Sequence, residues 1–438
     1  MKQETAGSSQ NYFWIAVLYV AQGFPFGFIN EAMPIAFRQA GVDLKKIGLL
    51  SLVGLPWTLK FLWSPAVDFL GRPKHWMLCC QCLLAASFFV LATHASGSGS
   101  ASVWALLVGM AVLSATQDIA IDGYSIRLLN ARELGTANGI RVGAYRIALI
   151  LAGGVLVGAS GEWGWPVVQG LAAGLMLALA GVTYFAPRTQ RVWRATGGQS
   201  SVTSSQSPVT SSQSPVTGSQ SPVNSGQASS AGEAKRSPIW EPVKLFFNRR
   251  GVIAVFIFIV IFKLGDYAMG PMTKPFLVDR GLSSVEIGLL LGTVGVAATI
   301  LGAFLGGVLT SRWGIFHALW ILGLFQAVSN LGYAGAAFAG GHTGLWAAAI
   351  FEMFCGGLGT AAFLAFLMSI CHKQFAATQY AVLSALFGLG RSLAGAASGY
   401  GASRFGYGSY FALTFLLALP AFALLPWVRK WTPDGKAK

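Results

Sequence analysis

Residues 47–72 read IGLLSLVGLPWTLKFLWSPAVDFLGR. The part from 47 to 68 is an apolar run in which Lys60 is the only charge before Asp68. A helix that spans a bilayer needs about 20 mostly apolar residues, so this run is long enough to cross a membrane. A short segment that ends in Arg72 follows it. The same alternation of a long apolar run and a short polar segment recurs along the chain, which indicates a membrane protein with many spans.

The composition of the chain agrees with a membrane protein. Of its 438 residues, 54% are hydrophobic and only 10% are charged, whereas a soluble globular protein carries about 25% charged residues. The net charge of +15 does not indicate a nucleic-acid partner, because the basic residues flank apolar segments and form no patch on a polar domain. The five cysteines lie in or beside apolar runs, without histidines placed to complete a metal site. We therefore expect no metal and no cofactor.

The apolar runs predict an all-α membrane protein with twelve transmembrane helices. The expected spans are 13–36, 47–68, 76–95, 102–128, 138–159, 165–186, 252–276, 285–310, 315–339, 344–371, 376–401 and 408–428. Between the sixth and the seventh, the heptapeptide SSQSPVT is followed by a second copy and a variant. This stretch has almost no large apolar side chains to bury, so we expect a disordered linker. The predicted organisation is a six-helix bundle at 1–187, a cytoplasmic linker at 188–250 and a second six-helix bundle at 251–438.

Short sequence matches indicate that the two bundles are related. IGLL at 47–50 recurs at 287–290, and GAYR at 143–146 has a counterpart in GLGR at 388–391. The two matches occur in the same order and at similar offsets, which favours two parallel six-helix halves. This is the layout of major facilitator transporters, whose substrate site lies between the halves near the middle of the membrane.

The distribution of basic residues predicts that both termini are cytoplasmic. Most lysines and arginines outside the spans lie on the side of the termini, for example Arg72, Lys74, Arg127, Arg249 and Arg250. Fewer lie in the loops expected on the opposite side, namely Arg38, Lys45, Lys46, Lys274, Arg280 and Arg404.

A loop motif after the second span resembles the major facilitator signature, which reads approximately G-x-x-x-D-R/K-x-G-R/K. Here SPAVDFLGR at 64–72 keeps Asp68 and Arg72, with serine in place of the first glycine. The corresponding GVLTSRWG at 307–314 has serine where aspartate is usual, followed by Arg312. The resemblance implies a conformational gate, in which Asp68 binds helix N-termini or an arginine in one conformation and releases them in the other. The alternative is a solvated loop charge.

Charged residues within the spans are candidates for function, because a charge at the bilayer centre costs at least ~2.5–3.5 kcal/mol. Asp118 and Asp122 lie four residues apart, on one helical face. Two close carboxylates repel each other when both are charged, so one of them can carry a proton near neutral pH, which suits proton coupling. The alternative is a structural ion pair with Arg141 or Arg146. A two-carboxylate metal site would lack a histidine nearby in the sequence.

Two further acids lie within predicted spans of the second half. Asp266 and Glu352 are candidates for proton coupling beside the first pair. Asp266 follows Lys263 by three residues, a spacing that favours a local ion pair on one helical face. Such a pair either neutralises the lysine or belongs to the ion path.

Cationic and aromatic residues in the spans predict the substrate site. Lys60 lies in mid-span with Trp57 and Trp63 three residues away on either side. It can therefore line a cavity for an anionic ligand that contains sugar rings. The alternative is a lysine that reaches toward the membrane interface beside tryptophans of the aromatic belt. Arg146 and Arg391 occupy similar positions in the two halves and either bind substrate carboxylates or phosphates or pair with the buried acids.

Several longer segments resemble the AmpG-type permeases of the peptide, acetyl-CoA and drug transporter branch of the major facilitator superfamily. These segments are 47–68, TQDIAIDGY at 116–124, FKLGDYAM at 262–269, ATILGAFLGG at 298–307, FQAVSNLGY at 325–333 and FEMFCGGLGTAAFLAFLMSICHKQFAATQYAVLSAL at 351–386. The resemblance covers nearly the whole chain except the linker. It implies a permease of the bacterial inner membrane that imports anhydro-muropeptides, fragments of the cell wall, together with protons. Because relatives carry siderophores or acetyl-CoA, a siderophore or another small anionic solute is the alternative substrate.

A membrane enzyme that acts on lipid-linked sugars is the alternative from a different class, with Asp118 and Asp122 as acid and base. Such enzymes usually carry sizeable loops at one membrane face, whereas the long loop here is of low complexity and lacks histidine, cysteine and clustered acids. The sequence therefore predicts a transporter and not an enzyme. Product analysis with a labelled substrate distinguishes the two, since a transporter releases its substrate unchanged.

Overall fold

The computed structural model describes residues 2–69, 72–94, 100–129, 134–187, 251–370 and 376–431, and these contain helices and no strands. The helices of the first half are α1 (Lys2–Gly27), α2 (Met33–Gln39), α3 (Leu44–Leu49), α4 (Leu55–Leu59), α5 (Ser64–Phe69), α6 (Pro73–Thr93), α7 (Ala101–Leu128), α8 (Leu134–Ile150) and α9 (Leu156–Tyr184). Those of the second half are α11 (Val252–Phe262), α12 (Leu264–Asp279), α13 (Ser284–Ile287), α14 (Gly295–Trp313), α15 (Ile315–Ala339), α16 (His342–Ile370), α17 (Ala376–Phe405) and α18 (Tyr407–Val428). Between some of them lie π-helical turns, η1 (Phe28–Ala32), η4 (Leu151–Val155) and η5 (Gly288–Val294), and 3₁₀ turns, η2 (Leu50–Gly54), η3 (Lys60–Leu62) and η7 (Arg429–Trp431). The predicted linker at 188–250 lies outside the described residues.

The described residues hold nine stretches that are long and apolar enough to span a membrane. One of them, Ile140–Tyr184, contains Gly164, whose φ of 76° interrupts the helix between the fifth and sixth predicted spans. The span predicted at 47–68 is divided into α3, η2, α4, η3 and α5. Gly54 and Pro56 favour this division, because glycine costs backbone entropy in a helix and proline lacks a backbone N–H. The number of twelve spans stays a prediction.

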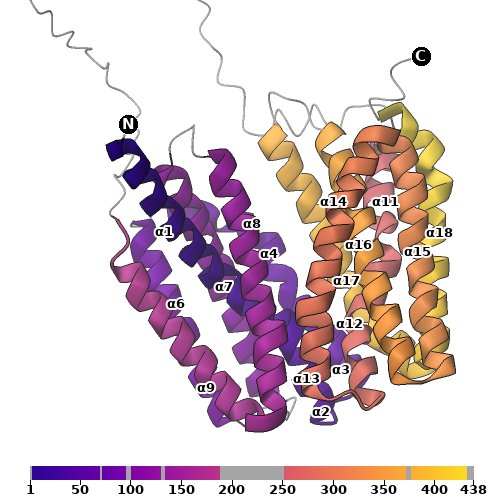
Figure 1. Ribbon diagram of the computed structural model, residues 1–438, viewed down its shortest axis with the longest axis horizontal. Coiled ribbons are helices and arrows are strands. Elements are labelled where there is room, and N and C mark those ends of the chain that lie inside the picture. Colours follow the sequence, from indigo (N-terminus) through magenta and orange to yellow (C-terminus); the bar gives the residue numbers. More distant parts are fainter. Residues whose placement is uncertain are drawn as a thin grey trace, which may run out of the picture.

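The chain folds into two helical bundles that lie close together at the end away from the termini (Figure 1). At this end, which we call the closed end, one apolar cluster includes Phe37 of the first half and Phe276 of the second. Toward the termini each half has a separate cluster, one around Tyr124 and one around Phe258. Among the described residues, the apolar core that the two halves share is the one at the closed end.

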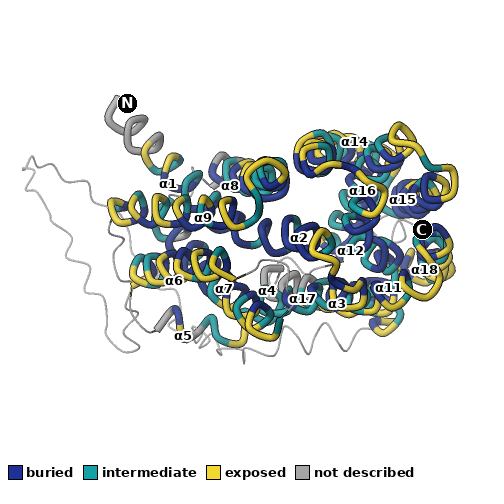
Figure 2. Tube along the Cα trace, turned by 90° about the horizontal axis from the view of Figure 1, so that it is seen from below, coloured by how far each residue is buried: buried dark blue, intermediate teal, exposed yellow. Residues whose placement is uncertain are grey.

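Figure 2, a view from the closed end, shows which helices meet there. Helix α2 lies beside α12, and α3 lies beside α17. Figure 2 also shows many exposed positions along the outside of the bundles. The exposed residues include large apolar ones such as Phe304 and Phe338. In a membrane protein, exposed apolar side chains on the outside of a helical bundle form the surface that contacts lipid.

Glycines allow the helices of the two halves to cross at very short range. A Cβ on Gly48 would lie 2.8 Å from the backbone nitrogen of Gly399, and a Cβ on Gly288 would lie 2.5 Å from the carbonyl oxygen of Gly154. Gly48 and Gly288 are the glycines of the repeated IGLL sequence. The glycine of each IGLL copy therefore makes the same kind of contact: it packs closely against a glycine of the other half.

Polar contacts complete the closed end. Arg38 of α2 binds Asp279 of α12 through two nitrogens, at 2.5 and 2.6 Å, and the Tyr407 hydroxyl donates to the same carboxylate at 2.7 Å. The Gln39 amide donates to the Ser284 hydroxyl at 2.8 Å. A bidentate arginine–carboxylate pair combines charge with a fixed geometry, so it stabilises one arrangement of the two halves.

Candidate functional site

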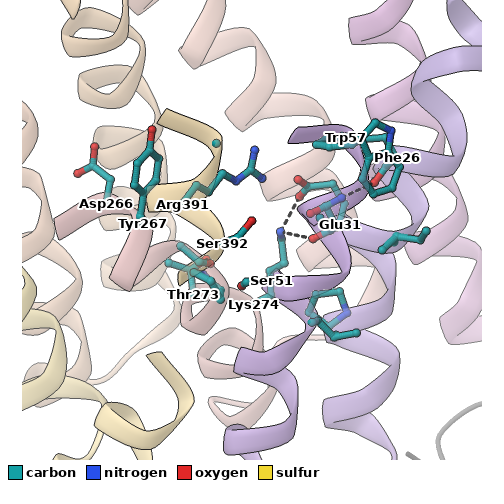
Figure 3. A pocket seen from close by; sticks show the side chains of 18 of the residues that line it. Phe26, Glu31, Ser51, Trp57, Asp266, Tyr267, Thr273, Lys274, Arg391 and Ser392 are labelled. Carbon is teal, nitrogen blue, oxygen red and sulfur yellow. Dashed lines mark hydrogen bonds and ion pairs between the residues drawn. The ribbon is translucent and has the colours of Figure 1, made fainter. Parts of the chain in front are cut away.

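A cavity of about 900 Å³ lies between the two halves. Its walls come from α1, η1, α2, α3, η2, α4 and η3 of the first half and from α12, η5, α15, α16 and α17 of the second (Figure 3). Five of the predicted site residues line it: Trp57, Lys60, Asp266, Glu352 and Arg391. Residues far apart in the sequence are therefore brought to one space between the bundles.

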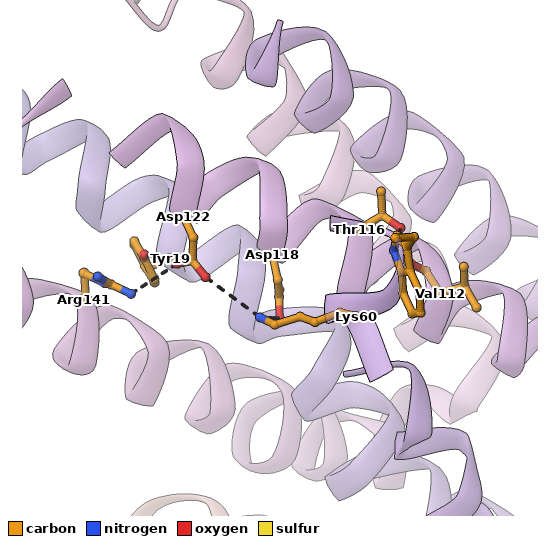
Figure 4. A network of polar contacts seen from close by, with 8 residues as sticks. Tyr19, Lys60, Val112, Thr116, Asp118, Asp122 and Arg141 are labelled. Carbon is orange, nitrogen blue, oxygen red and sulfur yellow. Dashed lines mark hydrogen bonds and ion pairs between the residues drawn. The ribbon is translucent and has the colours of Figure 1, made fainter. Parts of the chain in front are cut away.

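Lys60 connects the cavity to the acidic pair of α7 (Figure 4). Its Nζ lies 3.6 Å from Asp118 Oδ2 and 3.9 Å from Asp122 Oδ2. Asp122 also accepts a hydrogen bond from Arg141 at 3.1 Å and one from the Tyr19 hydroxyl at 2.6 Å. The predicted structural pairing with Arg141 is thus present, and it involves Asp122 alone.

Asp118 is less well compensated than Asp122. Its residue is 6% exposed, and its Oδ1 has no hydrogen-bond partner among the described residues. The neighbouring Gln117 is fully buried, and both polar atoms of its amide likewise lack a partner there. Buried polar groups without partners cost free energy, so this part of the first half is held at a cost to stability.

A second polar cluster lies where the seventh predicted span is broken. Lys263 separates α11 from α12, and its Nζ lies 3.3 Å from Asp266 Oδ2, so the local ion pair predicted from the sequence is confirmed. The same ammonium donates to Gln326 Oε1 at 2.5 Å and to Thr360 Oγ1 at 3.0 Å. Three acceptors match the three N–H donors of a lysine, so this buried charge is fully bonded. Glu352 lines the cavity and forms no ion pair with the described residues.

The other predicted substrate residues divide between the cavity and its surroundings. Trp57 lies edge-to-face on Phe26, with 5.0 Å between ring centroids, and both line the cavity. Trp63 does not line it, and its Nε1 donates to a threonine of α7 at 3.1 Å. Arg146 is half-buried on α8 and is not among the lining residues. Arg391 is exposed, with its guanidinium 5.8 Å from the Phe26 ring centroid.

Two charged residues of the cavity were given no role in the site predicted from the sequence, although Glu31 was a candidate as an acid within a span. Lys274, near the end of the span predicted at 252–276, was counted with the cations of the outer loops; it lies in α12, where its Nζ is 2.8 Å from Glu31 Oε2. This ion pair joins the two halves inside the cavity. The apolar pattern weakens after Pro271, so Lys274 resembled a loop residue. Glu31 was visible as a charge within a span, but no pattern in the sequence pointed to its partner.

The predicted gate residues lie away from the cavity. Arg72 is exposed at the N-cap of α6, and Arg312 is exposed in the last turn of α14. The Asp68 side chain lies outside the described residues. The gating role of the three residues stays a prediction. No group of three or more metal-ligating side chains occurs among the described residues.

Comparison with known proteins identifies the class. The family model described as Major Facilitator Superfamily matches residues 15–395, and the chain belongs to that superfamily of membrane transporters. It is 32% identical over 419 residues to the anhydromuropeptide permease of Escherichia coli K12. The alignment covers 94% of this chain and 78% of that protein. This likeness groups it with the AmpG-type permeases, as the sequence resemblance predicted. The chain is therefore a transporter and not an enzyme.

Two further relatives extend the comparison. An uncharacterised protein of Haemophilus influenzae is 28% identical over 93% of this chain and 91% of its own length. The putative transporter AmpG 4 of Rickettsia conorii is 25% identical over 94% of this chain and 95% of its own length.

Solved structures share the fold. A bacterial homologue of the human lysosomal transporter Spinster, in an inward-facing and unoccupied conformation, matches with a TM-score of 0.74 at 14% identity, over 98% of both chains. The nucleoside transporter NupG matches with a TM-score of 0.69 at 15% identity, over 96% of this chain and 98% of its own. These similarities confirm the predicted all-helical major facilitator fold.

Proposed function

We propose that this protein imports anhydro-muropeptides across the bacterial inner membrane together with protons. The likeness to an anhydromuropeptide permease supports the substrate class, and the cavity chemistry fits it. Trp57 can contact a sugar ring, while Lys60, Lys274 and Arg391 can bind the carboxylates of the lactyl group and the stem peptide. A volume of about 900 Å³ lies at the upper end of the range for small-molecule sites, which suits a ligand made of sugars and a peptide.

The observation that carries the proposed coupling is the position of Lys60, between the cavity and Asp118. While Asp118 is charged, it holds the Lys60 ammonium. A proton on Asp118 removes the shorter of the two carboxylate contacts of Lys60, so the ammonium is held less strongly and is more available to a substrate carboxylate in the cavity. The substrate and the proton thus favour each other's binding, and such mutual preference is the thermodynamic requirement for symport.

Transport requires that the cavity opens in turn to the two sides of the membrane. In the described state the halves share contacts at the closed end, through Arg38 and Asp279 among others. The distribution of basic residues supports an orientation in which both termini are cytoplasmic. The closed end then faces the periplasm, and this state is the one open to the cytoplasm.

Uptake by purified protein in lipid vesicles tests this proposal. With an inward proton gradient, we expect accumulation of a labelled anhydro-muropeptide above its external concentration, and equilibration only when the gradient is dissipated. A labelled ferric siderophore is the control substrate. Transport of the siderophore with no transport of the muropeptide would reject the proposed substrate but leave the transporter fold unaffected.

A further inference from the structure

Among the described residues, three cations line the cavity, and they differ in their carboxylate partners. Lys60 lies near the two carboxylates of α7, and Lys274 is paired with Glu31. Arg391 forms no ion pair with any acid among the described residues, and its guanidinium faces the Phe26 ring. Among the described residues, Arg391 is therefore the cation of the cavity that is most available to a ligand.

Each partner of the Lys274–Glu31 ion pair has a further contact that fixes its position. The Lys274 ammonium, whose side chain is 13% exposed, also donates to the Asn30 carbonyl at 2.7 Å. Glu31 lies in the π-helical turn η1 and packs against Gly153, where a Cβ would come within 2.8 Å of the Glu31 Cβ. The glycine thus leaves room for the glutamate stem. The Glu31 side chain is 33% exposed, so a ligand in the cavity can reach the pair.

Arg391 points toward the same carboxylate. Figure 3 shows its side chain extending from α17 into the cavity, on the side where Glu31 and Lys274 meet. The Glu31 carboxylate therefore lies where two cations of the second half, Lys274 and Arg391, converge.

We propose that Glu31 is an internal competitor for the substrate, occupying at Lys274 the place that a substrate carboxylate takes. The inference rests on the proposed function and specifies its anion subsite. A carboxylate of the ligand binds between Arg391 and Lys274, and Glu31 leaves Lys274.

The competition gives the cavity selectivity for anions. A neutral ligand offers Lys274 nothing that replaces the Glu31 charge, and breaking a well-desolvated ion pair without replacement is unfavourable. A carboxylate replaces that charge with an equal one. Ligands with a carboxylate at this position therefore bind at this subsite, whereas their amides leave the Lys274–Glu31 pair intact and bind more weakly, without the subsite.

Binding of matched ligands to the purified full-length protein tests the proposal. The probes are an anhydro-muropeptide with free carboxylates and the same compound with all its carboxylates amidated. We expect wild type to prefer the free acid. Glu31→Gln keeps the shape of the side chain but removes its charge. This variant should bind the free acid about tenfold or more tightly than wild type does, which is the effect of one charged hydrogen bond. Its affinity for the amide should be unchanged. Lys274→Gln should lose most of the preference.

Surface variants with the same chemical changes are the controls. Glu162→Gln and Lys46→Gln alter exposed residues outside the cavity and should leave both affinities unchanged. If Glu31→Gln changes both affinities equally, or neither, the pair only joins the halves and the competitor role is wrong. If the wild-type protein binds neither compound, although a thermal unfolding transition shows that it is folded, the proposed function is wrong and the inference is wrong with it.

Discussion

Asp118 and Asp122 differ in their partners although they share one face of α7. Asp122 receives hydrogen bonds from Tyr19 and Arg141, whereas Asp118 has an ion pair with Lys60 at 3.6 Å and an oxygen without a hydrogen-bond partner among the described residues. Asp122 therefore resembles a structural anion. Asp118 is the better candidate for a group that gains and loses a proton during transport.

The first prediction is that Asp118→Asn uncouples transport. A permanently neutral side chain mimics the protonated acid, so Lys60 stays available and substrate still crosses. We expect accumulation driven by a proton gradient to fall to equilibrium, a concentration ratio of about 1, while exchange of labelled for unlabelled substrate continues. Accumulation and exchange in the same vesicles measure this directly.

Asp122→Asn is the matched variant for this prediction. It should retain gradient-driven accumulation but lower the unfolding temperature, because Arg141 and Tyr19 lose their acceptor. If Asp122→Asn uncouples transport and Asp118→Asn does not, the roles of the two acids are reversed.

The individual charges of the site were predictable only where they interrupt an apolar run. Lys60, Asp118 and Asp266 are visible in the sequence for this reason, and the hydropathy pattern indicated each of them. Lys274 was missed because it lies near the end of an apolar run, where loop cations are common. Its pairing with Glu31 depends on the packing of the two halves, which no local pattern encodes.

At the level of helices, the break between α11 and α12 depends on a fully bonded lysine. The Lys263 residue is 3% exposed, and three acceptors from α12, α15 and α16 surround its ammonium. The lysine thus connects three helices of the second half at the depth of the cavity. The sequence predicted its local partner Asp266, but not the two contacts to distant helices.

The second prediction is that Lys263→Met destabilises the second half. Removing one partner leaves the Asp266 charge buried and uncompensated, which costs roughly 3–5 kcal/mol in comparable sites. Thermal unfolding in detergent should show a marked decrease of the melting temperature. The double variant Lys263→Met with Asp266→Asn should recover much of the loss. Equal stability of the single and double variants would show that the charge pair is not what stabilises this region.

The crossing of η4 and η5 depends on the absence of side chains. A Cβ on Gly292 would overlap the backbone of Gly154 in the facing turn. The third prediction is that Gly292→Ala disfavours the described state, because these backbones can no longer approach. Distances between spin labels on the two halves at the closed end should increase. Gly335→Ala, at an exposed position of α15 with open space, is the control and should leave the distances unchanged.

On the scale of the molecule, the sequence predicted the membrane class and the two-bundle architecture, because apolar runs and internal repeats are properties of the whole chain. It did not predict the subdivision of 47–68, since hydropathy is insensitive to a short helical break. It also could not predict which end of the bundles is closed. That depends on contacts between residues more than 200 positions apart, such as Arg38 with Asp279.

The fourth prediction concerns the connection between the halves, which we expect to be a tether. Deletion of 200–230 leaves 188–199 and 231–250, about 30 residues, which reach roughly 100 Å when extended. Membrane insertion and uptake should therefore persist at wild-type levels, as measured by surface expression and transport in the same cells. Loss of uptake at normal expression would show that the SSQSPVT repeats have a specific role.

The paired glycine crossings also bear on the origin of the chain. Gly48 meets Gly399 and Gly288 meets Gly154, and within these contacts Gly48 corresponds to Gly288 and Gly154 to Gly399. The two subunits of a symmetric dimer meet in this reciprocal way, with each contact present twice. A six-helix ancestor that associated with its own copy would have formed both crossings from one pair of residues. After duplication and fusion of such a gene, each crossing became free to change alone, so a mutation now alters one side of the closed end without altering the other.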